Sequence, residues 1–163
     1  MENDLKEMYW ILNLFVLFIF FLFVLVLLHK YCMADIRHKE EMKLQNDWMF
    51  NLLNGKRMEN YFRINSLFKI GIYGYNFFAD ELFYELYRTD IKPICFIDEK
   101  RLGMVSFYPD CEIVSLNEVD KKELDAIVIT VSDVNKVIRK RIENTYNGKV
   151  ILISDLVGYM GGK

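Results

Sequence analysis

Glycine and proline are missing from the first 54 residues of the sequence, since the first of the 8 glycines is Gly55 and the 2 prolines are Pro93 and Pro109. Charged residues are missing from residues 9–28. A segment without helix breakers favours a continuous helix, and an uncharged segment is not expected to lie in water. The front of the chain is therefore predicted to be helical and partly embedded in an apolar environment.

Histidine and cysteine are also scarce, and the net charge is small. The 2 histidines, His29 and His38, precede the predicted domain, so no Ser-His-Asp arrangement is available in it. The 3 cysteines, Cys32, Cys95 and Cys111, have no CxxC or Cys/His metal spacing and require no oxidising compartment. A net charge of −2 gives no electrostatic footprint for nucleic acid. We expect neither a metal site nor a nucleic-acid partner.

The apolar segment Tyr9–Leu28 contains twenty residues with one strongly polar member, Asn13. Twenty helical residues rise roughly 30 Å, which is the thickness of the hydrocarbon core of a bilayer. A signal peptide would carry a basic N-terminal region, a shorter apolar run and a cleavage site, and this segment has none of these. The sequence predicts a flank over residues 1–8 and a transmembrane helix over residues 9–28, with the lipid bilayer as its partner.

Basic residues near the two ends of this helix predict its orientation. The N-terminal flank offers only Lys6, whereas Lys30, Arg37, Lys39 and Lys43 follow the helix. The positive-inside bias places such a C-terminal flank in the cytoplasm. We expect a single-pass protein of the inner (cytoplasmic) membrane with a cytoplasmic C-terminal domain.

Residues 29–57 are predicted to continue as a helical stalk, with Gly55 as its C-terminal cap. Leu44, Trp48 and Leu52 recur at helical spacing and form an apolar stripe. The stripe is explained either by packing on the following domain or by self-association of the stalk. A homo-oligomer therefore stays among the expected partners.

Residues 58–157 are predicted to form an α/β domain, and residues 158–163 a flexible glycine-rich tail. Strands are expected over Lys69–Tyr73, Lys92–Ile97, Val105–Tyr108, Cys111–Val114, Ala126–Thr130 and Lys149–Ile153. Apolar runs without alternation, alternating with helices, are typical of a parallel sheet covered on both faces. Ser115 and Glu118 match a capping box, and Ser132 or Asp133 is expected to cap a later helix. The fold class is half of a dinucleotide-binding fold with four or five strands.

A ligand of such a sheet binds at the carboxyl ends of the strands. Gly74, Asp98 and Thr130 each stand where an expected strand ends. These residues are our candidates for a binding site, with phosphate at the N-terminus of the helix that begins near Phe77.

The segments IGIYGYNFFADELFYEL, ICFID and DAIVIT, in this order, resemble the small Rossmann-like modules of bacterial cell-surface polysaccharide proteins. The segment WMFNLLNGKRMENYF resembles a lead-in found with these modules, so the resemblance extends over roughly residues 48–157. Modules of this family accompany sugar-nucleotide epimerases or dehydratases, glycosyltransferases and acyltransferases. The resemblance implies NAD(P), CoA or a nucleotide sugar as ligand.

The glycine-rich turn of the family carries over to residues 74–79. Gly74 keeps the tight turn, and Ala79 permits close packing of helix and strand. Asn76 replaces the glycine that lets the backbone approach a pyrophosphate, and Tyr75 stands where the family has small or polar residues. Asp98 matches the ribose-binding acid in position, although a carboxylate that caps the strand-end turn fits equally well.

No catalytic residue is predicted. The predicted domain has no Tyr-x-x-x-Lys pair. Glu81 and Glu85 are four residues apart, so they are expected to lie on one face of a helix that is either exposed to solvent or packed on a neighbour. We expect a membrane-anchored, nucleotide- or nucleotide-sugar-binding accessory module that serves polysaccharide biosynthesis beside a glycosyltransferase or sugar-nucleotide enzyme. The alternatives are a scaffold or oligomerisation protein with a degenerate ligand site, and a truncated NAD-dependent sugar-nucleotide epimerase or dehydratase.

Overall fold

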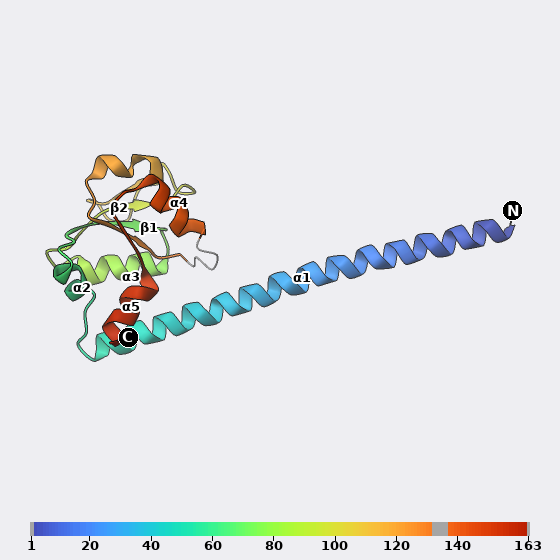
Figure 1. The fold of residues 1–163 in the computed structure, drawn as a ribbon, viewed down its shortest axis with the longest axis horizontal. Coiled ribbons are helices and arrows are strands. Elements are labelled where there is room, and N and C mark those ends of the chain that lie inside the picture. The colour runs from blue at the N-terminus through green and yellow to red at the C-terminus, as the bar shows by residue number, and fades with distance from the viewer. Residues whose placement is uncertain (1, 132–136, 163) are drawn as a thin grey trace. The chain divides into compact units, whose positions relative to one another are not determined.

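The computed structural model describes residues 2–131 and 137–162 and shows an α/β domain preceded by a long apolar helix (Figure 1). Two compact units are present, Met1–Met42 and Lys43–Lys163. The helices are α1 (Glu2–Leu53), α2 (Glu59–Ile64), α3 (Phe77–Leu86), α4 (Val137–Thr145) and α5 (Ile153–Gly161), with a 3-10 helix η1 (Leu116–Lys122). The strands are β1 (Lys69–Tyr73), β2 (Lys92–Ile97), β3 (Glu112–Val114), β4 (Ala126–Ile129) and β5 (Lys149–Leu152).

Helix α1 is continuous because no glycine or proline interrupts it before Gly55. Its part Leu12–Leu53 is the one segment of the described residues that is long and apolar enough to cross a membrane, judged by length and composition. The apolar side chains of residues 12–28 are exposed, except that of Val24, which is half-buried. An exposed apolar helix of this length agrees with the predicted anchor.

The end of α1 confirms the predicted cap. Gly55 lies in the left-handed region with φ +74°, its N–H donates to the carbonyl of Leu52, and the N–H of Lys56 donates to the carbonyl of Asn51. This pair of bonds is the Schellman motif, which satisfies carbonyls that have no partner inside the helix. The chain can therefore turn sharply toward α2.

All five strands are parallel and lie in the order β3-β2-β1-β4-β5. This is the order of the first five strands of doubly wound dinucleotide-binding folds, in which each crossover places a helix on a face of the sheet. The predicted bounds of β1 and β2 agree with the structure residue by residue. A parallel α/β sheet flanked by helices is therefore confirmed.

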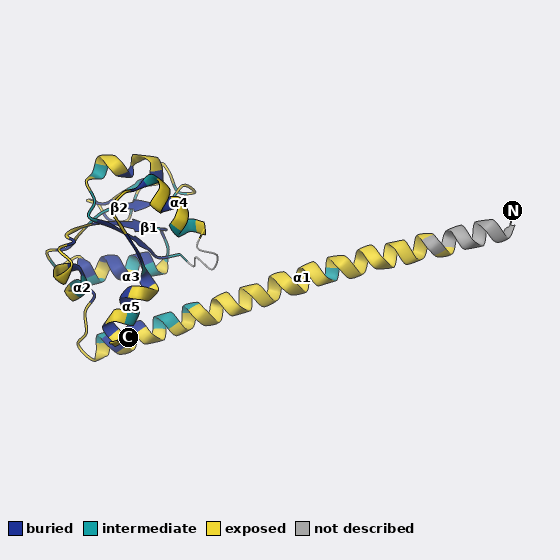
Figure 2. Cartoon of the chain, viewed as in Figure 1, coloured by how far each residue is buried: buried dark blue, intermediate teal, exposed yellow. Residues whose placement is uncertain are grey.

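The sheet is buried on both faces because alternate residues of each strand enter two apolar clusters (Figure 2). In β4, Ala126 and Val128 belong to the cluster under α3 and α5, whereas Ile127 and Ile129 belong to the cluster under η1 and α4. The absence of hydrophobic alternation in AIVI follows directly from this arrangement.

The last turns of α1 belong to the globular unit, which confirms domain packing as an explanation of the apolar stripe. Trp48 is 4% exposed, and Leu44 and Leu52 pack against the same cluster as α3. The carboxylate of Glu85 accepts hydrogen bonds from Trp48 Nε1 at 2.8 Å and from the N–H of Met58 at 2.6 Å. Burial raises the pKa of Glu85, and these two bonds oppose that rise. We call these three residues the Glu85 joint.

Two predicted segments differ from the structure. Val105–Tyr108 is not a strand. The N–H of Phe107 donates to Tyr75 Oη and the N–H of Tyr108 donates to Ser106 Oγ, so these two groups do not form hydrogen bonds with a neighbouring strand. The tail predicted for residues 158–163 is helical up to Gly161, since α5 packs its apolar face on the sheet.

Two smaller expectations concern helix caps. The capping box of Ser115 and Glu118 is present, and it begins a 3-10 helix, η1. The cap expected at Ser132 or Asp133 lies outside the described residues.

The Glu85 joint predicts that Trp48→Phe destabilises the domain. This change removes a hydrogen bond to a part-buried carboxylate, so we expect the free energy of unfolding to fall by about 1–3 kcal/mol. The measurement is denaturant unfolding of the full chain in detergent. Trp10→Phe is the matched control, because Trp10 is exposed on α1. Equal midpoints for both variants would contradict the joint.

Candidate functional site

The candidate site lies at the carboxyl edge of the sheet, where β1, β2 and β4 end next to one another. The N–H of Gly74 donates to the carbonyl of Ile97, and Thr130 Oγ1 donates to the carbonyl of Tyr73 at 2.9 Å. Parallel strands bring their ends together at the same edge, and in this strand order the edge contains the switch point between β1 and β4. The structure thus brings together the loops that carry the predicted site residues.

Gly74 occupies a position that no other residue fits. Its φ is +96°, and a Cβ there would lie 2.4 Å from Val131 Cγ1 and 3.2 Å from Thr130 Oγ1. Both the backbone conformation and the neighbouring strand end require glycine. The tight turn expected from the sequence is therefore present.

Asn76 acts as the N-cap of α3. Its Oδ1 accepts from the N–H of Ala79 at 3.0 Å, and its Nδ2 donates to the carbonyl of Thr130 at 3.3 Å. Its φ of −143° is extended, so the left-handed conformation that asparagine tolerates is not used. The amide oxygen occupies one of the helix N-terminal donors that a bound phosphate would otherwise use.

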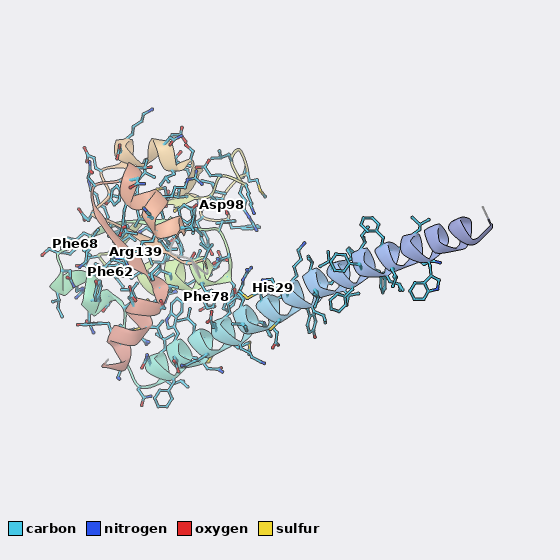
Figure 3. All side chains as sticks on the ribbon, turned by 45° about the vertical axis from the view of Figure 1, so that its right-hand side comes forward. His29, Phe62, Phe68, Phe78, Asp98 and Arg139 are labelled. Atoms are coloured by element: carbon cyan, nitrogen blue, oxygen red, sulfur yellow. The ribbon has the colours of Figure 1, made fainter. Side chains whose placement is uncertain are left out.

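Asp98 (labelled in Figure 3) follows β2, and its hydrogen bonds join the loops that follow β1 and β2. Its Oδ2 accepts from the N–H of Tyr75 at 3.2 Å, and its Oδ1 accepts from the N–H of Lys100 at 2.9 Å. The side chain is 19% exposed, and Arg101 Nε lies 4.0 Å from Oδ2. Asp98 thus makes the turn-capping bonds that were the alternative to ribose binding.

The ring of Tyr75 lies in the core of the domain and is 6% exposed. It packs edge-on against Phe96 with 4.8 Å between ring centroids and stacks on Phe107 at 6.3 Å. The Arg101 guanidinium carbon lies 5.1 Å from the centre of the Tyr75 ring. Tyr75 therefore fills space at the end of β2, beside Asp98.

A second tyrosine fixes the loop that leads from β2 to β3, and sequence reasoning missed it. Tyr108 Oη donates to Asp80 Oδ1 at 2.9 Å, and its ring stacks on Phe83 with centroids 3.9 Å apart. Burial and the hydrogen bond to Asp80 raise the pKa of Tyr108. Tyr108 lies in Val105–Tyr108, which the sequence predicts to be a strand.

The described residues offer little for catalysis or ligation. They contain no group of three His, Cys, Asp or Glu side chains placed to hold a metal. Burial raises the pKa of Cys95 and of Cys111 to about 12, so both thiols stay protonated at neutral pH. Among these residues every buried side-chain nitrogen and oxygen has a hydrogen-bond partner.

A small hollow of about 60 Å³ lies between the end of α1 and the start of α3. Its lining comprises Gln45, Trp48, Met49, Leu52, Phe77 and Glu81. This volume holds only a few water molecules. The predicted ligand residues do not line it.

A family model described as C2185-like, N-terminal matches residues 66–151, which is just over half of the chain. The chain belongs to this family. The matched segment begins before β1 and ends within β5, so it includes the turn at Gly74, the carboxylate of Asp98 and the end of β4. No curated protein and no solved structure matches the chain significantly.

The bonds of Asp98 predict a structural penalty for Asp98→Ala. The change leaves the N–H groups of Tyr75 and Lys100 without their acceptor, so we expect a loss of about 1–3 kcal/mol in the free energy of unfolding. The measurement is denaturant unfolding of the full chain. Asp110→Ala, an exposed carboxylate of the same loop, serves as the control and is expected to change the free energy by about 0.5 kcal/mol or less. An Asp98→Ala variant as stable as this control would refute the capping role.

Proposed function

We propose that this chain is a membrane-anchored docking module with a Rossmann-like sheet, without chemistry of its own. It holds enzymes of cell-surface polysaccharide synthesis at the cytoplasmic membrane of a bacterium. The observation that carries this proposal is the mutual hydrogen bonding of the residues predicted to bind a ligand. Asp98 accepts from backbone N–H groups, and Asn76 bonds with Ala79 and Thr130.

The membrane part of the proposal rests on α1. Apart from Asn13, residues 12–28 are apolar and almost all exposed, and the basic residues Lys30, Arg37, Lys39 and Lys43 follow them. A helix of this composition is stable across a bilayer, and the positive-inside bias places the α/β domain on the cytoplasmic side. The chain is thus proposed to be a single-pass protein of the inner membrane.

The pathway part of the proposal rests on the resemblance of the β1–α3, β2 and β4 segments to modules of polysaccharide proteins. The partner would be a glycosyltransferase or a sugar-nucleotide enzyme, and further copies of this chain are a second class of partner. A docking module needs a rigid domain and an exposed surface, and it does not need an open pocket. The packed turn at Gly74 and the buried Tyr75 agree with this requirement.

A nucleotide-binding module, for NAD(P) or a nucleotide sugar, is the second candidate. The observation that favours it is the turn at Gly74, whose φ of +96° keeps the start of α3 at the switch point of the sheet. For such a ligand to bind, Tyr75 and Asp98 would have to exchange their present partners for it.

The docking proposal predicts that nucleotides do not stabilise the protein. We expect no shift of the melting temperature of the full chain in detergent with NAD(H), NADP(H), UDP-sugars or CoA, because the candidate groups are engaged with one another. A ligand at a hundred times its dissociation constant would add about 2.7 kcal/mol, which raises the melting temperature by several degrees. A reproducible rise with any one of them would favour the second candidate.

The pathway assignment predicts a change in surface polymer. Deletion of the gene in the bacterium that encodes this chain is expected to lower the amount of surface polysaccharide, measured by sugar analysis of the cell envelope. The full chain is expected to restore it, and so is Glu123→Gln, a control at an exposed residue far from the candidate site in sequence. Unchanged polymer after deletion would contradict the assignment.

A further inference from the structure

The loop between β2 and β3 exposes several apolar side chains. Val105 is 91% exposed and Phe107 is 85% exposed, and Leu102 and Met104 are exposed beside them. We call residues 102–107 the apolar loop. Single exposed apolar residues are ordinary, but four within six positions form a patch, and such patches are typical of interaction sites.

The apolar loop is held in place at both ends. At its start, the N–H of Met104 donates to the carbonyl of Arg101. At its end, the N–H of Phe107 donates to Tyr75 Oη, and Tyr108 Oη donates to Asp80. The backbone that carries the apolar side chains is therefore fixed, and some of its N–H groups form hydrogen bonds within the domain.

Basic side chains flank this patch. Lys100 and Arg101 precede it directly, and Arg141 on α4 lies 3.4 Å from Glu99, which places α4 beside the start of the loop. Lys140 on α4 is also exposed. Glu99 is engaged with Arg141 and with the N–H of Leu116. An apolar loop flanked by cationic side chains is complementary to a bilayer surface with anionic headgroups.

We propose that the apolar loop inserts into the headgroup region of the same membrane that α1 anchors, with the exposed Lys100 and Lys140 against anionic lipid. This inference rests on the proposed membrane anchor. The anchor raises the local concentration of lipid, so a loop with a weak affinity of its own can remain bound. Val105 and Phe107 enter the interface.

The test uses the full chain with Cys32→Ser and Val105→Cys, labelled at residue 105 with an environment-sensitive fluorophore; the native Cys95 and Cys111 are buried. The protein is reconstituted in vesicles of phosphatidylethanolamine and phosphatidylglycerol that carry spin-labelled acyl chains. We expect the emission to shift to the blue and to lose most of its intensity by quenching. Ile64→Cys is the matched control, because Ile64 is apolar, 74% exposed and lies before β1, at the opposite edge of the sheet. Its label is expected to keep its emission.

The charge part of the inference is tested in the same vesicles. Lys100→Glu is expected to reduce the quenching of the label at residue 105, whereas Lys121→Glu, on η1, is expected to leave it unchanged. The same reduction is expected for the labelled chain with Lys100 retained when phosphatidylglycerol is replaced by phosphatidylcholine.

Three outcomes are distinguishable. Equal emission from labels at residues 105 and 64 would overturn the insertion of the loop. A blue shift at residue 105 without lipid quenching, together with crosslinked dimers, would also overturn it and would assign the loop to a second copy of the chain. Failure of the protein to float with the vesicles in a density gradient would refute the anchor itself, independently of the loop.

Discussion

The hydrogen bond from the N–H of Tyr75 to Asp98 is the constraint on which the carboxyl edge of the domain depends. It joins the turn after β1 to the turn after β2, and these are the two turns that would enclose a ribose in a dinucleotide-binding fold. The same carboxylate also accepts from Lys100, so it organises the start of the next loop. Beside this bond, the Tyr75 ring packs edge-on against Phe96, and its hydroxyl accepts a hydrogen bond from the N–H of Phe107 in the loop after β2.

The topology could be predicted because its determinants are local in sequence. Apolar runs such as KIGIY and KPICFI are too short for helices and lack alternation, which is what burial on both faces of a parallel sheet imposes. Gly74 and Gly55 marked a turn and a helix end, because only glycine adopts these positive φ values without strain. Where the same reasoning failed, at Val105–Tyr108, a β-rich pattern was overridden by side-chain acceptors from Tyr75 and Ser106.

The site could be predicted only in part. That Gly74, Asp98 and Thr130 lie at one edge follows from the parallel topology alone. Which partners their polar atoms choose does not follow, because the bonds join loops that are far apart in sequence: Tyr75 and Asp98 are separated by 23 residues, and Asn76 and Thr130 by 54. Motif comparison describes the position of a residue in the sequence and does not describe the hydrogen bonds that its side chain makes.

The Glu85 joint has a consequence for the order in which the domain assembles. Its partners Met58 and Trp48 precede Glu85 by 27 and 37 residues, whereas Asp125 reaches back over 57 residues to the N–H of Phe68. Loop-closure entropy makes the shorter connections less costly, and all members of the joint leave the ribosome before β4 does. The last turns of α1 can therefore pack on α3 while the second half of the sheet is still being synthesised, so that this part of the core forms at an early stage.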